Sequence, residues 1–280
     1  MLTWGQGGLH ITQRPSAYSG KANFLFGVKL ALATVALIRP LLVSKTTLIM
    51  ANTSLPMRTL AGITVPDTPL ITAAIELARK HLNDISFQHI MRSWLFGFAI
   101  ADKIPPLQSR DRELHALAAI LHDLGWDTKS TFISPDKRFE VDGANAARSF
   151  IQQEIESSHA QGWDQHRLQL LWDAIALHTT PSIAQHKEPE VAATGLGIFA
   201  DFRGVDAVPG TMTQAEWDAI VAEFPRHGFR DGVVEIMCGL CRTKPETTYD
   251  NFVADFGDAL VEGYSSKGHR PIEMILATQE

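Results

Sequence analysis

The chain has 280 residues, of which 45% are hydrophobic, and its formal net charge at pH 7 is -6. This length allows one sizeable hydrophobic core, or one domain with an appendage, and the absence of a basic stripe argues against nucleic acid as a partner. The only two cysteines, Cys238 and Cys241, exclude a disulfide framework and fit a reducing compartment. Their CxxC spacing supplies at most half of a zinc site, and ordinary small residues on a helix are the simpler interpretation.

Residues 1–66 contain no Asp or Glu. The apolar run "LALATVALI" is much shorter than the roughly 20 residues that span a bilayer, so we expect no stable membrane span. An acid-free, basic start is typical of an organelle presequence, whereas Met50 is also a plausible start of a soluble protein. We therefore expect residues 1–60 to be a poorly packed or presequence-like extension. The expected location is the cytoplasm, or the mitochondrion if residues 1–50 are a presequence.

From Asp67 onwards the spacing of apolar residues predicts helices in succession. The first covers residues 66–82, with Asp67 or Thr68 as the N-cap, and the third is expected to stop at Gly125. No run alternates with period two for long enough to predict a strand. The sequence thus predicts an all-α fold, with one helical domain over residues 67–265 and a C-terminal tail over 266–280. The further helical segments are 86–104, 109–125, 142–156, 164–180, 188–204, 213–224, 231–243 and 247–264.

Four ionisable residues lie in apolar helical surroundings. His89 is in the second helix, His122 and Asp123 end the third, and Asp201 is in the sixth. Burying a carboxylate requires a partner, a proton or a metal. Two imidazoles and two carboxylates from three helices suit a divalent cation, and helical bundles commonly build metal sites in this way. Each residue alone has an ordinary structural explanation, but the order H…HD…D is more specific.

These residues resemble the HD-domain superfamily of all-α, metal-dependent hydrolases. The matching segments are "FQHIMRSWLFG", "AAILHDLGWD" and "GIFADF". Together with "RFEVDGANAA" and "AIALHTTPSIAQHKEPEVA", they are similar to the cyanamide hydratase-like branch. The resemblance covers roughly residues 67–255 and implies metal ligation by His89, His122, Asp123 and Asp201. It implies an HD domain over 67–265 with a mononuclear metal site in the helical core.

The sequence also departs from the usual HD-domain pattern. Binuclear HD enzymes usually carry a further His where Phe139 stands, so we expect one divalent ion per chain: zinc first, with iron, manganese or cobalt as alternatives. Many HD phosphohydrolases carry Lys or Glu where this chain has Trp126, which offers bulk and one N–H donor. Lys129 is near in sequence and could supply the missing charge. A small neutral substrate therefore fits better than a phosphate ester.

The resemblance favours a metal-dependent hydratase or hydrolase that adds water to a small neutral nitrogen compound of the cyanamide or nitrile type. Asp123 is expected to orient the water, and His178 to contact substrate or carry a proton, although a surface position at a helix end is as plausible. Arg92 lies one turn after His89, where it could hold a carboxylate behind the ligands or form a simple salt bridge. The alternatives are a phosphohydrolase acting on nucleotides and a non-catalytic helical module. The apolar segment "SWLFGFAI" leaves room for a homo-oligomeric surface.

Overall fold

The computed structural model describes residues 55–127 and 130–279. Most of the expected N-terminal extension, residues 1–54, therefore lies outside the described residues, as does Lys129. The described residues belong to one structural unit, Asn52–Glu280. Within the described ranges, no helix is both long enough and apolar enough to cross a bilayer. The described chain is mainly helical, which confirms the all-α prediction.

The structure begins with a β-hairpin that the sequence analysis missed. Strand β1 (Met57–Leu60) pairs antiparallel with β2 (Ile63–Pro66). The connecting residues Ala61 and Gly62 have φ values of 47° and 80°. Two central residues with positive φ give the turn twist that matches paired strands. The prediction of no strand was wrong here because four-residue strands are too short to show an alternating pattern.

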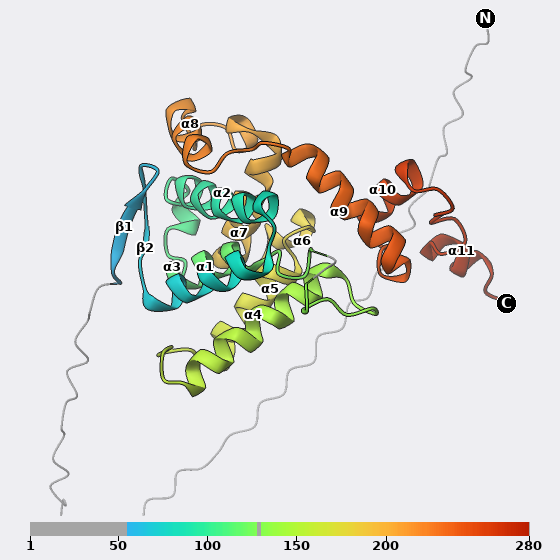
Figure 1. Cartoon of the computed structure of the whole chain (residues 1–280), viewed down its shortest axis with the longest axis horizontal. Helices are drawn as coiled ribbons and strands as arrows, with labels where there is room; N and C mark the ends of the chain where they lie inside the picture. Colours follow the sequence, from blue (N-terminus) through green and yellow to red (C-terminus); the bar gives the residue numbers. More distant parts are fainter. Residues whose placement is uncertain (1–54, 128–129, 280) are drawn as a thin grey trace, which may run out of the picture. The chain divides into compact units, whose positions relative to one another are not determined.

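The helices follow the predicted order, and one pair of them positions the site. Helix α2 packs lengthwise on α7 (Figure 1). Glycine permits this close approach, because a Cβ on Gly197 would lie only 2.3 Å from the Ser93 carbonyl oxygen. Thr68 caps the first helix by accepting a hydrogen bond from the amide of Ile71. The helices of this part are α1 (Pro69–His81), α2 (Asp84–Ala101), α3 (Arg112–Leu121), α4 (Phe139–Glu156), α5 (Gln165–Ala176), α6 (Pro181–Ala184) and α7 (Pro189–Arg203).

Two expectations for this part need correction. Helix α3 ends at Leu121 rather than at Gly125. Gly125 instead allows the turn after α3 to lie against α4, since a Cβ there would be 2.2 Å from the Phe139 carbonyl oxygen. Residues 93–100, which were considered for a partner surface, are all buried inside the unit. That segment therefore gives no reason to expect an oligomer.

The last part of the chain forms a second, smaller cluster of buried side chains. Helix α9 contributes Val233 and Met237, which pack with Trp126 and Phe139 from the turn after α3 and the start of α4. In Figure 1, α9 extends from the α8 side of the bundle to α10 and α11. Cys238 and Cys241 on α9 are buried free thiols. The helices here are α8 (Gln214–Glu223), α9 (Phe229–Thr243), α10 (Val253–Leu260) and α11 (Pro271–Leu276).

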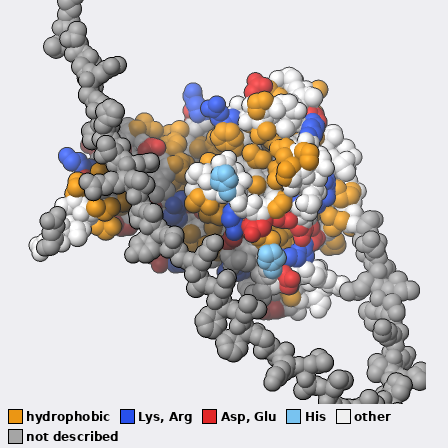
Figure 2. Space-filling view, turned by 180° about the vertical axis from the view of Figure 1, so that it is seen from behind, with side chains coloured by type: hydrophobic (Ala, Val, Ile, Leu, Met, Phe, Trp, Pro, Cys, Tyr) orange, Lys and Arg blue, Asp and Glu red, His pale blue; other side chains and the backbone are white. Residues whose placement is uncertain are grey.

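Short 3-10 turns complete the connections, at Pro105–Leu107, Val205–Ala207 and Pro245–Thr247. The first begins with two prolines, directly after the expected end of the second helical segment at residue 104. Figure 2 shows one face of the molecule, on which hydrophobic, acidic and basic side chains are interspersed where the structure describes them.

Candidate metal centre

Three of the predicted ligands meet at one point in the core. His89 lies in the middle of α2, and His122 and Asp123 lie in the turn that follows α3. The apolar residues around them place all three side chains in the interior, where each is nearly inaccessible to solvent. Among the residues that the structure describes, they form the one group of His, Cys, Asp or Glu side chains close enough to hold a metal ion.

The donor atoms form a nearly regular triangle. Asp123 Oδ2 lies 3.1 Å from His122 Nε2 and 3.6 Å from His89 Nε2. The two Nε2 atoms are 3.4 Å apart. Tetrahedral zinc with bonds of about 2.0–2.2 Å places neighbouring donors about 3.3–3.6 Å apart. The three donors therefore fit a divalent cation with little adjustment, and three protein ligands leave a coordination position open, as in catalytic zinc sites.

Neighbouring groups fix both imidazoles in the orientation that a ligand needs. His122 Nδ1 donates to the Ala119 carbonyl oxygen at 2.8 Å, and His89 Nδ1 donates to Asp201 Oδ2 at 2.6 Å. In its neutral form, each ring then presents the lone pair of Nε2 to the centre. Burial lowers the pKa of His89 below its usual value, although the Asp201 and Asp123 carboxylates oppose this effect. Neutral imidazole is the form that binds a metal.

The surroundings of Asp123 show whether the side chains present fit a metal ion. Its Oδ2 is buried and accepts no hydrogen bond from the residues that the structure describes. A buried carboxylate oxygen without a donor is costly. A cation bound by this oxygen and the two Nε2 atoms would remove that cost, so the side chains present fit a metal ion.

Asp201 occupies a different place from the one expected of a fourth ligand. Its Oδ2 meets His89 at Nδ1, the ring nitrogen that faces away from the triangle. Arg92 donates to both of its oxygens, from Nε at 2.9 Å and from Nη2 at 2.8 Å, and Arg226 Nε lies 3.3 Å from Oδ1. Burial would raise the pKa of Asp201, but hydrogen bonds from His89 and Arg92 lower it below its usual value. In this structure, Asp201 holds His89 instead of completing the donor set.

Arg92 thus combines the two alternatives considered from the sequence. Its bidentate ion pair with Asp201 is buried, and the same carboxylate orients a metal-binding imidazole. The remaining Nη1 donates to the carbonyl oxygens of Phe224 and Pro225 at 3.2 and 2.8 Å. The guanidinium group is therefore engaged behind the site.

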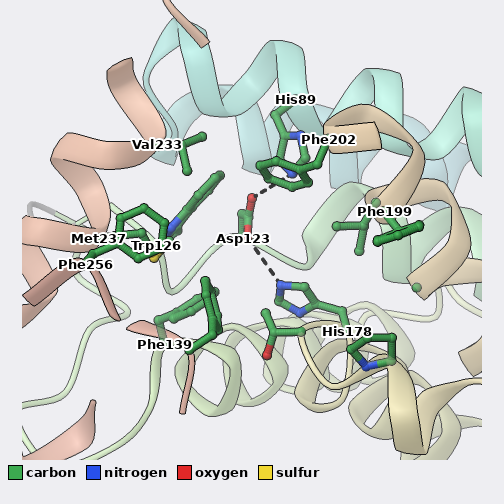
Figure 3. Close-up of a pocket in the computed structure, with 15 residues that line it drawn as sticks. His89, Asp123, Trp126, Phe139, His178, Phe199, Phe202, Val233, Met237 and Phe256 are labelled. Atoms are coloured by element: carbon green, nitrogen blue, oxygen red, sulfur yellow. Dashed lines mark ion pairs between the residues drawn. The ribbon is translucent and has the colours of Figure 1, made fainter. Parts of the chain in front are cut away.

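His178 lies inside the site and not on the surface. Its Nδ1 donates to the Ile175 carbonyl oxygen at 2.6 Å, and its Nε2 is 3.8 Å from Asp123 Oδ1 (Figure 3). Burial, followed by the nearby His122, lowers the pKa of His178 to about 4. Its neutral ring directs an unprotonated nitrogen toward Asp123.

The site lies at the base of a cavity of about 340 Å³. Its polar lining consists of His89, Asp123, His178 and Thr179, and the rest is mostly aromatic or aliphatic. Trp126 and Phe139 line it, as the sequence suggested for the region around the HD pair. The sequence analysis missed the residues that complete the wall: Pro181, Gly195, Ile198, Phe199, Phe202, Val233, Met237, Phe252 and Phe256. The only available signal was their apolar character, which ordinary core residues share.

An all-α fold with a His/Asp cluster, built from one helix and the turn after another, is typical of metal-binding helical proteins. Residues 86–203, from the first turn of α2 to the last residue of α7, match the family model of the HD domain. HD domains belong to a superfamily of metal-dependent hydrolases. The match does not distinguish the cyanamide hydratase-like branch from the rest of that superfamily. No curated protein matched the chain.

Proposed function

We propose that this protein is a mononuclear metal-dependent hydratase or hydrolase that adds water to a small neutral nitrogen-containing group of the cyanamide or nitrile type. His89, His122 and Asp123 would hold the metal, and Asp201 would orient His89. One observation carries the proposal. The potential metal ligands His89, His122 and Asp123 lie close together beside a cavity whose described lining includes no Lys or Arg.

A divalent cation held at this triangle would lower the pKa of a water molecule and polarise the substrate. The side chains supply the remaining functions. His178 has Nδ1 committed to a backbone carbonyl, which leaves Nε2 as a proton acceptor next to Asp123. The indole ring of Trp126 contributes to the wall of the cavity. The apolar wall excludes bulk water from the reacting group.

The charge of the pocket disfavours a phosphate ester. A phosphate group requires Lys, Arg, a helix N-terminus or additional metal. Arg92, which could have supplied this charge, is held by Asp201 and two carbonyl oxygens behind the ligands. Phe139, a buried side chain that lines the pocket, offers no donor for a second ion. A neutral group adds no charge that this wall would have to balance.

The test compares two reactions on one preparation of the zinc-loaded full chain. We expect urea formation from cyanamide, and little release of phosphate from a panel of nucleoside monophosphates. Elemental analysis should give close to one ion per chain. The variant Asp123→Ala should lose both ion and activity, whereas Asp218→Ala, which removes an exposed carboxylate on α8, should keep both. Phosphate release without hydration, or two ions that survive gel filtration, would contradict the proposal.

A further inference from the structure

We infer that the substrate is larger than its reacting group: a neutral molecule that carries an apolar body, either an aromatic ring or an alkyl chain of similar size, next to the nitrogen group that is hydrated. This inference rests on the proposed function for the identity of the reacting group. The apolar body is inferred independently, from the size, lining and mouth of the cavity.

The cavity is too large for cyanamide alone. Its volume is about 340 Å³. At about 30 Å³ per non-hydrogen atom, the volume of one water molecule in the liquid, the three such atoms of cyanamide occupy at most about 90 Å³. The cavity instead falls within the range of about 300–1,000 Å³ that is typical of sites for drug-sized ligands. It has room for a reacting group and a body of roughly eight further atoms on the same scale.

Apolar side chains flank the polar side chains of the lining on both sides. In the view of Figure 3, Trp126, Met237 and Phe256 lie on one side of Asp123, and Phe199 lies on the other. Among the described residues, the lining includes no Lys or Arg, and Asp123 is its one carboxylate. A molecule with one polar end at Asp123 and an uncharged, apolar remainder matches this distribution.

The mouth of the cavity exposes aromatic side chains. Phe202, Phe199 and Phe252 have exposed fractions of 49%, 41% and 38%, and all three line the cavity. Removing apolar surface from water is favourable by about 25 cal/mol per Å². A ligand that extends from the metal centre to the mouth would cover these rings, whereas a three-atom substrate at the base would leave them in water.

The corresponding reaction is the hydration of a monosubstituted cyanamide. Water adds across the carbon–nitrogen triple bond: its oxygen bonds to carbon and its hydrogens go to nitrogen. R–NH–CN and water therefore become R–NH–CO–NH2, with no oxidant, reductant or leaving group. The product is an N-substituted urea in which R is the apolar body.

The test measures binding of these product ureas to the zinc-loaded full chain by calorimetry, from urea through N-ethylurea to N-octylurea, with N-phenylurea. We expect Kd to fall about fourfold for each added methylene, which corresponds to about 0.8 kcal/mol, until the chain fills the cavity. N-phenylurea should bind at least about tenfold more tightly than urea. A Kd that stays within twofold across the series would overturn the inference.

The same protein separates this inference from the proposed function. If the protein hydrates cyanamide but its Kd is the same for all the ureas, the proposed function stands and the inferred apolar body of the substrate is wrong. If Kd falls with each added methylene but neither cyanamide nor its N-substituted forms are hydrated, the apolar pocket stands and the proposed reaction is wrong.

Two variants at the mouth locate the effect. Phe252→Ala and Phe199→Ala remove partly exposed rings and should weaken N-octylurea and N-phenylurea at least fivefold while changing urea less than twofold. Leu260→Ala is the matched control, because Leu260 is exposed on α10 and does not line the cavity. Circular dichroism checks the fold. Equal weakening by Leu260→Ala, or no weakening by either mouth variant, would contradict the inference.

Discussion

Two buried carboxylates, Asp142 and Asp123, have opposite environments. Asp142 accepts hydrogen bonds from Lys244 Nζ at 2.8 Å and from the Ser134 amide and hydroxyl at 3.0 and 2.7 Å. Asp123 has one oxygen with no donor, which faces two unprotonated imidazole nitrogens instead. Both side chains are almost fully buried. Burial alone therefore does not distinguish a structural carboxylate from a functional one.

The difference lies in what compensates the charge. Lys244 and Ser134 compensate Asp142 within the protein, and this ties the segment before α4 to the end of α9. No Lys or Arg among the described residues compensates the Asp123 carboxylate, whereas a cation bound by His89, His122 and Asp123 would do so. The first arrangement should govern stability, and the second should govern metal binding and catalysis.

The largest expected effect is that of removing Asp123. Asp123→Ala should lower kcat/KM by about a thousandfold or more, since the site loses its only carboxylate donor. The free energy of unfolding of the metal-free protein should not fall by more than about 1 kcal/mol, because a poorly compensated buried charge is removed. Steady-state kinetics and urea denaturation measure the two quantities. A large loss of stability with retained activity would reverse the roles of Asp123 and Asp142.

The opposite result is expected at Lys244. Lys244→Met leaves Asp142 buried without its cation and should lower the free energy of unfolding by about 3–5 kcal/mol. Bound metal per folded chain should stay the same. The double variant with Asp142→Leu should recover much of the loss, since no buried charge then remains. If the double variant is no more stable than the single one, the uncompensated charge is not the cause.

A smaller effect is expected from a substitution at Asp201. Its size distinguishes a carboxylate that orients His89 from one that binds the metal directly. Asp201→Asn keeps an oxygen that can accept from His89 but removes the charge. If Asp201 orients His89, metal affinity should fall by about 10–100-fold, as is typical when such outer partners are changed. Competition with a coloured chelator measures it, with Asp218→Asn as the control. Complete loss of the metal from a folded variant would instead indicate direct ligation.

The smallest effect concerns a buried histidine outside the site. His115 is buried and accepts a hydrogen bond from Arg110 Nε, and burial, followed by Arg110 and Arg112, places its pKa well below its usual value. The unfolded chain therefore binds more protons below about pH 6.5, so this residue makes stability fall as pH falls. His115→Gln should show a weaker loss of stability than the wild type between about pH 7 and pH 5. His159→Gln, at an exposed side chain, should follow the wild type.

The sequence alone predicted the helical order and a cap of the first helix at Asp67 or Thr68, of which the structure shows Thr68. It also singled out His89, His122 and Asp123, which the structure brings together. Apolar periodicity and capping are local, so they are readable wherever a segment is long enough. The hairpin Met57–Pro66 was missed because its strands are short and its Ala61–Gly62 turn lacks the usual Asn or Asp.

Only the tertiary structure decided how those residues are arranged. The sequence shows Asp201 as an acidic residue on an apolar helix. This pattern is the same whether Asp201 binds a metal or a histidine. The packing of α7 on α2 determines that it meets His89 at Nδ1 and not at the donor triangle. Packing likewise brings Met237 and Phe252 to a cavity whose base is formed by Asp123, more than a hundred residues earlier in the chain. Such contacts depend on how distant elements pack, and local periodicity carries no information about that.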